Sequence, residues 1–164
     1  MGRAVLRGSR APDRGRRCPV HPGTGRGAAS DAIAYFQDLG LRLALASSSP
    51  SVLIRAVLDV SGLGDRFEVL HSAEGEASGK PDPAVHLTAA RKLGVRPEWC
   101  LAVEDSPSGV RAAKAAGMLC VAVPDRPPPD GQFHGADFVL ASLRDVGDSL
   151  WEALDGEPVR TAGP

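Results

Sequence analysis

The chain has 164 residues, of which 43% are hydrophobic and 24% are charged, a composition typical of a globular domain with one core. Its net charge of −1 conceals two unequal parts, because residues 1–28 carry a net charge of +6 and the remainder carries −7. The acidic body gives no basis for nucleic-acid binding, and there is no apolar run of membrane-spanning length, so we expect a cytoplasmic protein without nucleic-acid or membrane partners.

Residues 1–29 are rich in Arg, Gly and Pro and show no helical or strand period. We expect this leader to be disordered or not native to the fold. A basic arm that binds nucleic acid and a transit peptide are two other interpretations of the same composition. Cys100 and Cys120 lie inside apolar, strand-like runs, which predicts reduced thiols in the core rather than disulfides.

From residue 30 onward, segments with the patterns of strands and helices alternate. Strands are predicted over 41–46, 67–71, 100–104, 119–123 and 137–140. Helices are predicted over 30–39, 51–60, 84–93, 109–116 and 142–154, with Ser30 and Ser49 as N-caps of the first two and Pro50 at a first helical position. The alternation predicts an α/β fold over residues 30–154, a Rossmann-like three-layer core with a mostly parallel sheet, followed by a loose tail at 155–164.

Polar residues follow three of the predicted strands. Ser47 follows the first, Lys80 lies in the loop after the second, and Glu104 and Asp105 close the third. In a parallel sheet these junctions open on one edge, so the four side chains are expected to meet there. Each also has a plainer interpretation: a capping hydroxyl, a solvated lysine, or carboxylates that form a turn and begin a helix.

Together these residues predict a phosphate site with a cation. A hydroxyl and the N–H groups at a helix start can hold phosphoryl oxygens. A lysine offsets the charge that builds up during phosphoryl transfer, and adjacent carboxylates can hold Mg²⁺. The combination is more informative than any of its members.

The same residues carry a resemblance to a known family. The order and spacing of four motifs are similar to those of the haloacid dehalogenase (HAD) superfamily, in the branch of β-phosphoglucomutase and the sugar-phosphate phosphatases. The motifs are Ala44-Leu-Ala-Ser-Ser-Ser-Pro50, Ser72-Ala-Glu74, Gly79-Lys-Pro-Asp-Pro83 and Val103-Glu-Asp-Ser-Pro-Ser-Gly109. The likeness runs from about residue 30 to residue 154, and residues 136–143 match the family's closing strand and turn.

The resemblance implies a role for each matching position. Ser47 would bind the phosphoryl group with help from the Ser48 backbone, and Lys80 would be the catalytic lysine that also contacts phosphoryl oxygens. Glu104 and Asp105 would be the Mg²⁺ ligands. The expected cofactor is therefore Mg²⁺, and the expected partner is a small phosphorylated sugar or a related metabolite.

The family's first strand, however, ends in Asp-x-Asp, and its first aspartate attacks phosphorus. This chain contains no Asp-x-Asp. That strand lies at the centre of the family's sheet, and only Ala4-Val5-Leu6 is available here as a short substitute, so we expect the central strand and the helical cap domain to be missing. Two sheet edges would then lack partners, and self-association through such an open edge is one interpretation.

The expected function is thus a Mg²⁺-dependent HAD-type phosphatase or phosphomutase for small sugar phosphates, in a truncated form with little or no turnover. The alternative is a non-catalytic remnant that binds phosphate or Mg²⁺, or an interaction protein. A nucleic-acid binder led by the basic start is the third interpretation.

Overall fold

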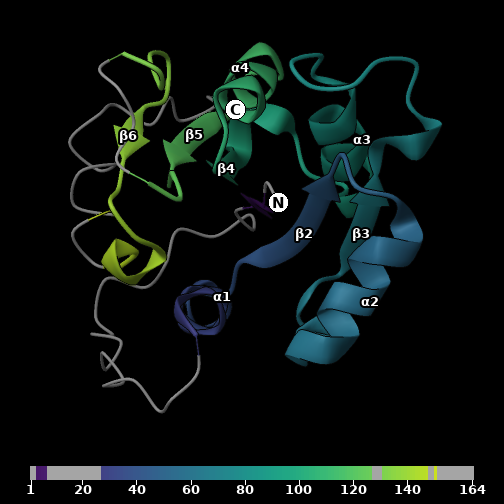
Figure 1. Ribbon diagram of the computed structural model, residues 1–164, viewed down its shortest axis with the longest axis vertical. Helices are drawn as coiled ribbons and strands as arrows, with labels where there is room; N and C mark the ends of the chain where they lie inside the picture. Colours follow the sequence, from purple (N-terminus) through teal and green to yellow (C-terminus); the bar gives the residue numbers. More distant parts are fainter. Residues whose placement is uncertain (1–2, 7–26, 127–130, 148–149, 151–164) are drawn as a thin grey trace, which may run out of the picture.

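The computed structural model describes residues 3–6, 27–126, 131–147 and 150. Within this part of the chain, six strands form one sheet in the order β3-β2-β1-β4-β5-β6 (Figure 1). Their bounds are β1 Arg3–Leu6, β2 Arg42–Ser47, β3 Val69–Ser72, β4 Cys100–Glu104, β5 Leu119–Ala122 and β6 Phe138–Val139. The pairs β2–β3, β4–β5 and β5–β6 are parallel, which confirms the mostly parallel α/β sheet predicted from the alternating pattern.

The centre of the sheet differs from the expectation. The position between β2 and β4 is filled by β1, which pairs antiparallel with both neighbours. The short apolar run at residues 4–6 therefore supplies the backbone partners of two strands that would otherwise face each other unpaired. The expected gap, and the self-association that was inferred from its open edges, have no basis at this position. Because both pairings are antiparallel, β2 and β4 still point in the same direction.

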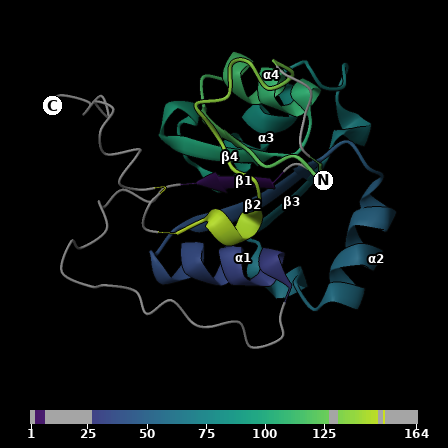
Figure 2. The same ribbon diagram turned by 60° about the vertical axis from the view of Figure 1, so that its left-hand side comes forward.

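Four helices of the described chain cover the two faces of the sheet (Figure 2). Their bounds are α1 Ala28–Asp38, α2 Ser51–Ser61, α3 Ala84–Leu93 and α4 Pro107–Ala115. Helices α1 and α2 lie on one face, whereas α3 and α4 lie on the other. This is the predicted three-layer arrangement.

The alternation of side chains along each strand divides the core in two. In β2, Leu43 and Leu45 pack with Ile33 and Ile54 on the side of α1 and α2. Ala44 and Ala46 pack with α3 and α4 on the other side. β4 follows the same rule, with Leu101 and Val103 toward α1 and with Cys100 and Ala102 toward α3 and α4. Small residues on the second face allow its helices to approach the sheet closely.

The helix starts show where the capping predictions were wrong. Helix α1 begins at Ala28 after the N-cap Gly27, so Ser30 lies inside its first turn. Helix α2 has Pro50 as its N-cap, with no capping bond from a side chain, so Ser49 is not its cap. Helix α4 begins at Pro107, two residues before the predicted start, and Ser106 caps it by accepting a bond from the Gly109 N–H. Hydroxyls lie at or near the start of all three helices, and composition alone does not say which one turns toward the backbone.

The predicted closing helix is also largely absent where it can be seen. Residues Leu143–Asp145 form a single 3₁₀ turn, η4, and the turn is closed by reciprocal bonds between Ser142 and Asp145. Val146 and Gly147 are not helical, whereas Leu150 is assigned to a helix. Residues 148–149 and 151–154 of the predicted helix, most of the leader and the predicted tail lie outside the described residues. No helix in the described part of the chain is both long and apolar enough to cross a membrane.

Candidate active site

The candidate site lies at the edge where the parallel strands end. Ser47 is the last residue of β2 and Glu104 is the last residue of β4, and β1 occupies the place between them. Leu45 and Val103 are both opposite Arg3, so β2 and β4 end at nearly the same level. Two strand spacings separate them, roughly 9–10 Å. The edge therefore presents two polar groups with the width of one strand between them.

Lys80 reaches this edge from the loop that follows β3. Its Nζ lies 2.7 Å from Oε1 of Glu104, and the two side chains are 8% and 0% exposed. An ammonium group beside a fully buried carboxylate supplies the charge that burial requires. The structure thus brings together two predicted site residues that are 24 positions apart in the sequence.

Glu104 is directed by its place in the strand. It alternates with Val103, so its side chain lies on the same face of the sheet as Ala102, toward α3 and α4. There it meets Gly109 in the first turn of α4, where a Cβ would lie 1.8 Å from Glu104 Oε2. A glycine at this position is therefore required by the carboxylate, not by the conformation of its own backbone.

His86 of α3 completes the surroundings of Glu104, and nothing in the sequence reasoning indicated it. The imidazole is fully buried, with Nε2 3.1 Å from Glu104 Oε1. This contact is not a hydrogen bond, because neither ring nitrogen of His86 has a hydrogen-bond partner among the described residues. The feature of the sequence that could have indicated His86 is its place next to Val85, on a helix face that is otherwise mostly apolar.

Ser47 lies on the opposite face from Glu104, in line with Leu43 and Leu45, and is only 2% exposed. Its Oγ accepts a bond from the Ser49 N–H at 3.1 Å, and Ser48 between them is exposed. The first N–H of α2, from Ser51, is donated to Glu74 at 2.6 Å. This helix-start N–H, expected to be available for phosphoryl oxygens, therefore already has a carboxylate partner.

A cleft of about 440 Å³ opens beside the end of β4. Its polar lining comes from Glu104, Asp105, Asp125 and Ser142, and Val103, Val123 and Leu143 supply most of the apolar part. Asp125 and Ser142 follow β5 and β6 and were not among the predicted site residues. Like the predicted site residues, Asp125 and Ser142 lie at or beyond the carboxyl end of a strand of the sheet.

The donor set fits a magnesium ion better than a metal enclosed by protein ligands. No group of three or more His, Cys, Asp or Glu side chains able to hold a metal occurs among the described residues. Magnesium is commonly bound by one or two carboxylates together with water and substrate phosphate. Asp105 and Glu104 both line the cleft, and Oε2 of Glu104 is a buried carboxylate oxygen without a hydrogen-bond partner.

The two described cysteines are not nucleophiles. Cys100 and Cys120 are free and buried, as predicted for reduced core thiols. Burial raises the pKa of each thiol to about 12, so neither is a thiolate at neutral pH.

Within the described residues, the central strand carries no aspartate in the place of the one that attacks phosphorus in the resembled family. Because β1 runs antiparallel to its neighbours, its first residue, Arg3, lies at the level of Leu45 and Val103 near the site edge, and Leu6 lies at the far end. The chain has no Asp-x-Asp motif anywhere. The site therefore combines a lysine, hydroxyls and carboxylates without a nucleophile on the central strand.

Comparison with known proteins gives a consistent result. The model of the haloacid dehalogenase-like hydrolase family matches residues 21–117. Hexitol phosphatase B of Escherichia coli is 40% identical over 129 residues, which cover 78% of this chain and 56% of that protein. Protein CbbY of Cupriavidus necator is 34% identical over 147 residues, covering 88% of this chain and 56% of that protein. The chain thus spans about half the length of these relatives.

Solved structures match the fold. The crystal structure of CbbY from Rhodobacter sphaeroides in complex with phosphate superposes with a TM-score of 0.68 and 34% identity, covering 74% of this chain and 56% of that one. β-Phosphoglucomutase from Clostridium difficile gives a TM-score of 0.72 at 24% identity, covering 81% of this chain and 57% of that one. The latter likeness concerns the fold alone.

Proposed function

Since this chain belongs to the haloacid dehalogenase-like hydrolase family, we propose that its site binds the phosphoryl group of a small sugar phosphate together with Mg²⁺. The observation that carries the proposal is the buried pair of Lys80 and Glu104 beside a cleft at the carboxyl edge of the sheet. The similarity of the chain to a hexitol phosphatase and to a CbbY crystallised with xylulose-1,5-bisphosphate supports a sugar phosphate as ligand.

Each residue has a role that its position allows. The Ser47 hydroxyl and the Ser48 backbone N–H donate to phosphoryl oxygens, and Lys80 offsets their negative charge. Glu104 and Asp105 would hold Mg²⁺, which would supply positive charge to the phosphoryl oxygens. Lys80 also compensates the negative charge of the buried Glu104 carboxylate.

We propose further that this chain has little or no turnover. Phosphoryl transfer in the family needs a carboxylate positioned to attack phosphorus, and the central strand here contributes none. A role in binding without catalysis is the second candidate, favoured by the same absence of Asp-x-Asp from the sequence.

Two measurements test these proposals. Calorimetric titration with orthophosphate and Mg²⁺ should show binding that weakens in Lys80→Met and Asp105→Asn. Hydrolysis of p-nitrophenyl phosphate with Mg²⁺ should stay near background. Robust hydrolysis that Asp105→Ala abolishes would show that the site is complete and that the account of the central strand is wrong. A folded chain indifferent to phosphate and Mg²⁺ would contradict the binding proposal itself.

A further inference from the structure

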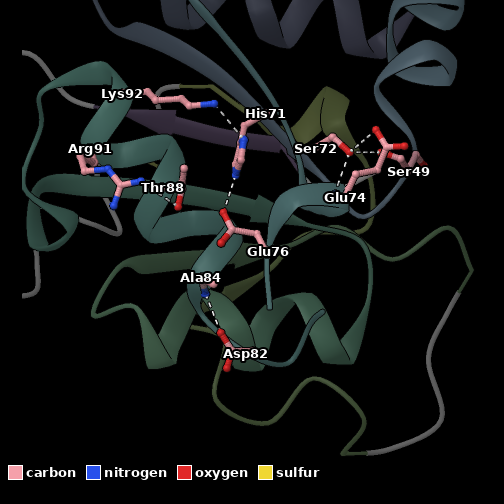
Figure 3. Close-up of polar contacts among 10 residues, drawn as sticks. All are labelled: Ser49, His71, Ser72, Glu74, Glu76, Asp82, Ala84, Thr88, Arg91 and Lys92. Atoms are coloured by element: carbon pink, nitrogen blue, oxygen red, sulfur yellow. Dashed lines mark hydrogen bonds and ion pairs between the residues drawn. The ribbon is translucent and has the colours of Figure 1, made fainter. Parts of the chain in front are cut away.

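Two side chains at the end of β3 and just beyond it, those of Ser72 and Glu74, connect this strand to the segment that joins β2 to α2. Strands β2 and β3 end together, with Ser47 opposite Ser72. Beyond them, the 3₁₀ turn η2 (Ala73–Gly75) places Glu74 beside the start of α2 (Figure 3). The Ser51 N–H donates to Glu74 Oε2 at 2.6 Å, and the Ser72 hydroxyl donates to the carbonyl oxygen of Ser49 at 2.7 Å.

These bonds hold the backbone that directly follows Ser48. The Ser49 N–H donates a hydrogen bond to Ser47 Oγ, and the Ser72 hydroxyl donates one to the Ser49 carbonyl oxygen. The Ser51 N–H donates to the Glu74 carboxylate. Ser48 lies between Ser47 and Ser49, which are joined by one of these bonds, and it is exposed. The direction in which its N–H points is therefore set by contacts from the neighbouring strand as well as by its own segment.

Glu74 contacts both Ser51 and Ser72, so it links the start of α2 to the end of β3. One of its carboxylate oxygens, Oε2, lies 2.6 Å from the Ser51 nitrogen and 3.3 Å from the Ser72 hydroxyl, and the Glu74 backbone N–H donates to that same hydroxyl at 3.2 Å. The bond from the Ser51 N–H, at the positive end of α2, lowers the pKa of Glu74 below its ordinary value. The carboxylate is thus ionised at neutral pH and makes charge-assisted hydrogen bonds.

We propose that Glu74 is a positioning residue for the phosphate-binding loop Ser47–Ser49, acting through Ser51 and Ser72. This inference rests on the proposed function, because it assigns Glu74 a part in the binding of phosphate at that loop. The carboxylate fixes the start of α2 and leaves the phosphoryl group to the N–H and hydroxyl groups of Ser47 and Ser48. Without it, the Ser51 N–H loses its partner and the loop samples other conformations, so phosphate binds more weakly.

The same segment offers a matched control. Glu76 lies two residues further on and turns the other way, toward α3, with Oε1 2.7 Å from His71 Nε2 (Figure 3). It is also a glutamate with a lowered pKa, here through a hydrogen bond from His71. Its side-chain partners are His71, Thr88 and Arg91, which lie outside the loop at 47–51, so a general loosening of this segment is separable from a loss of loop position.

The experiment compares Glu74→Ala, Glu74→Gln and Glu76→Ala with the unaltered chain. The dissociation constant for orthophosphate is measured by calorimetry with Mg²⁺ present, and amide hydrogen exchange is measured over residues 47–53. Glu74→Ala should weaken phosphate binding about tenfold and speed exchange at Ser51, since one charge-assisted bond is lost. Glu74→Gln should recover most of the affinity because its amide oxygen still accepts, and Glu76→Ala should leave affinity unchanged.

Three results would overturn the inference. One is wild-type affinity in a folded Glu74→Ala variant, and another is an equal loss in Glu74→Ala and Glu76→Ala. The third is unaltered exchange at Ser51 in Glu74→Ala. The unaltered chain could bind no phosphate while Glu74→Ala still speeds exchange at Ser51. In that case the proposed function fails, and Glu74 only stabilises the conformation of the loop. The exchange measurement therefore separates the two failures.

Discussion

The ammonium nitrogen of Lys80 lies 2.7 Å from a carboxylate oxygen of Glu104, and this carboxylate is entirely buried. Replacing only the lysine, as in Lys80→Met, leaves Glu104 buried without its counter-charge. We expect the free energy of unfolding to fall by about 3–5 kcal/mol. The double variant Lys80→Met/Glu104→Gln should recover most of this loss, because it removes the charge that had lost its partner.

Urea denaturation at neutral pH measures both variants, and Lys114→Met serves as control for a half-exposed lysine that pairs with Asp137. A cost for Lys80→Met no larger than that of the control, about 1 kcal/mol or less, would mean that the Lys80–Glu104 pair is solvated.

Gly109 gives a prediction whose sign is informative. In a helix interior, Gly→Ala ordinarily stabilises by about 1 kcal/mol. Here the added Cβ would lie 1.8 Å from Glu104 Oε2, so Gly109→Ala must displace the carboxylate or the first turn of α4. We expect a net destabilisation of about 1–3 kcal/mol, measured by urea denaturation.

The control for this substitution is Gly64→Ala, where nothing lies within 4 Å of the added Cβ and φ is not positive. It should be close to neutral. A stabilised Gly109→Ala would contradict the placement of the Glu104 carboxylate against α4.

The contact between Glu76 and His71 should make stability depend on pH. The hydrogen bond from His71, followed by that from Thr88, lowers the pKa of Glu76 below the ordinary 4.5. A carboxyl whose pKa is lower in the folded state contributes stability that is complete above the unfolded pKa and disappears as pH falls through the folded pKa. The stability difference between the unaltered chain and Glu76→Gln should therefore shrink as the pH falls below 4.5.

Urea midpoints over a series of pH values measure this difference. Lys92 and Arg91 lie in the same cluster, with Lys92 Nζ 3.2 Å from His71 Nδ1, and both stay charged over the acidic range (Figure 3). A difference that grows as the pH falls below 4.5 would show that the pKa of Glu76 is raised rather than lowered.

The central position of β1 is directly testable. Val5 lies opposite both Leu43 and Leu101, so its backbone is inside the sheet rather than at an edge. Val5→Pro removes an N–H from the ladder and should cost about 3 kcal/mol or more. Val5→Thr keeps the N–H and the β-branched shape and should cost much less. Equal stability of the proline variant and the unaltered chain in thermal melts would show that residues 3–6 do not pair with β2 and β4 in solution.

Much of the fold was predictable because its signals are local. Apolar runs, turn residues and helical periods predicted β4 at 100–104 and α3 at 84–93 with the bounds that the structure has. The helix starts were less predictable, because Ser30 and Ser49 have the composition of caps and the backbone around them decides otherwise. The direction of β1 was not predictable either, since a short apolar run such as residues 4–6 can pair in either direction.

The sequence by itself determined the residue types of the site and their order along the chain: Ser47, Lys80, Glu104 and Asp105 after successive strands, and no Asp-x-Asp. Only the tertiary structure decided which of them meet. Strand alternation turns Glu104 toward α3 and α4, where Lys80, His86 and Gly109 surround it, and it turns Ser47 toward the other face. Glu74 reaches α2 only because β2 and β3 end side by side, a contact between positions 23 residues apart that no local pattern specifies.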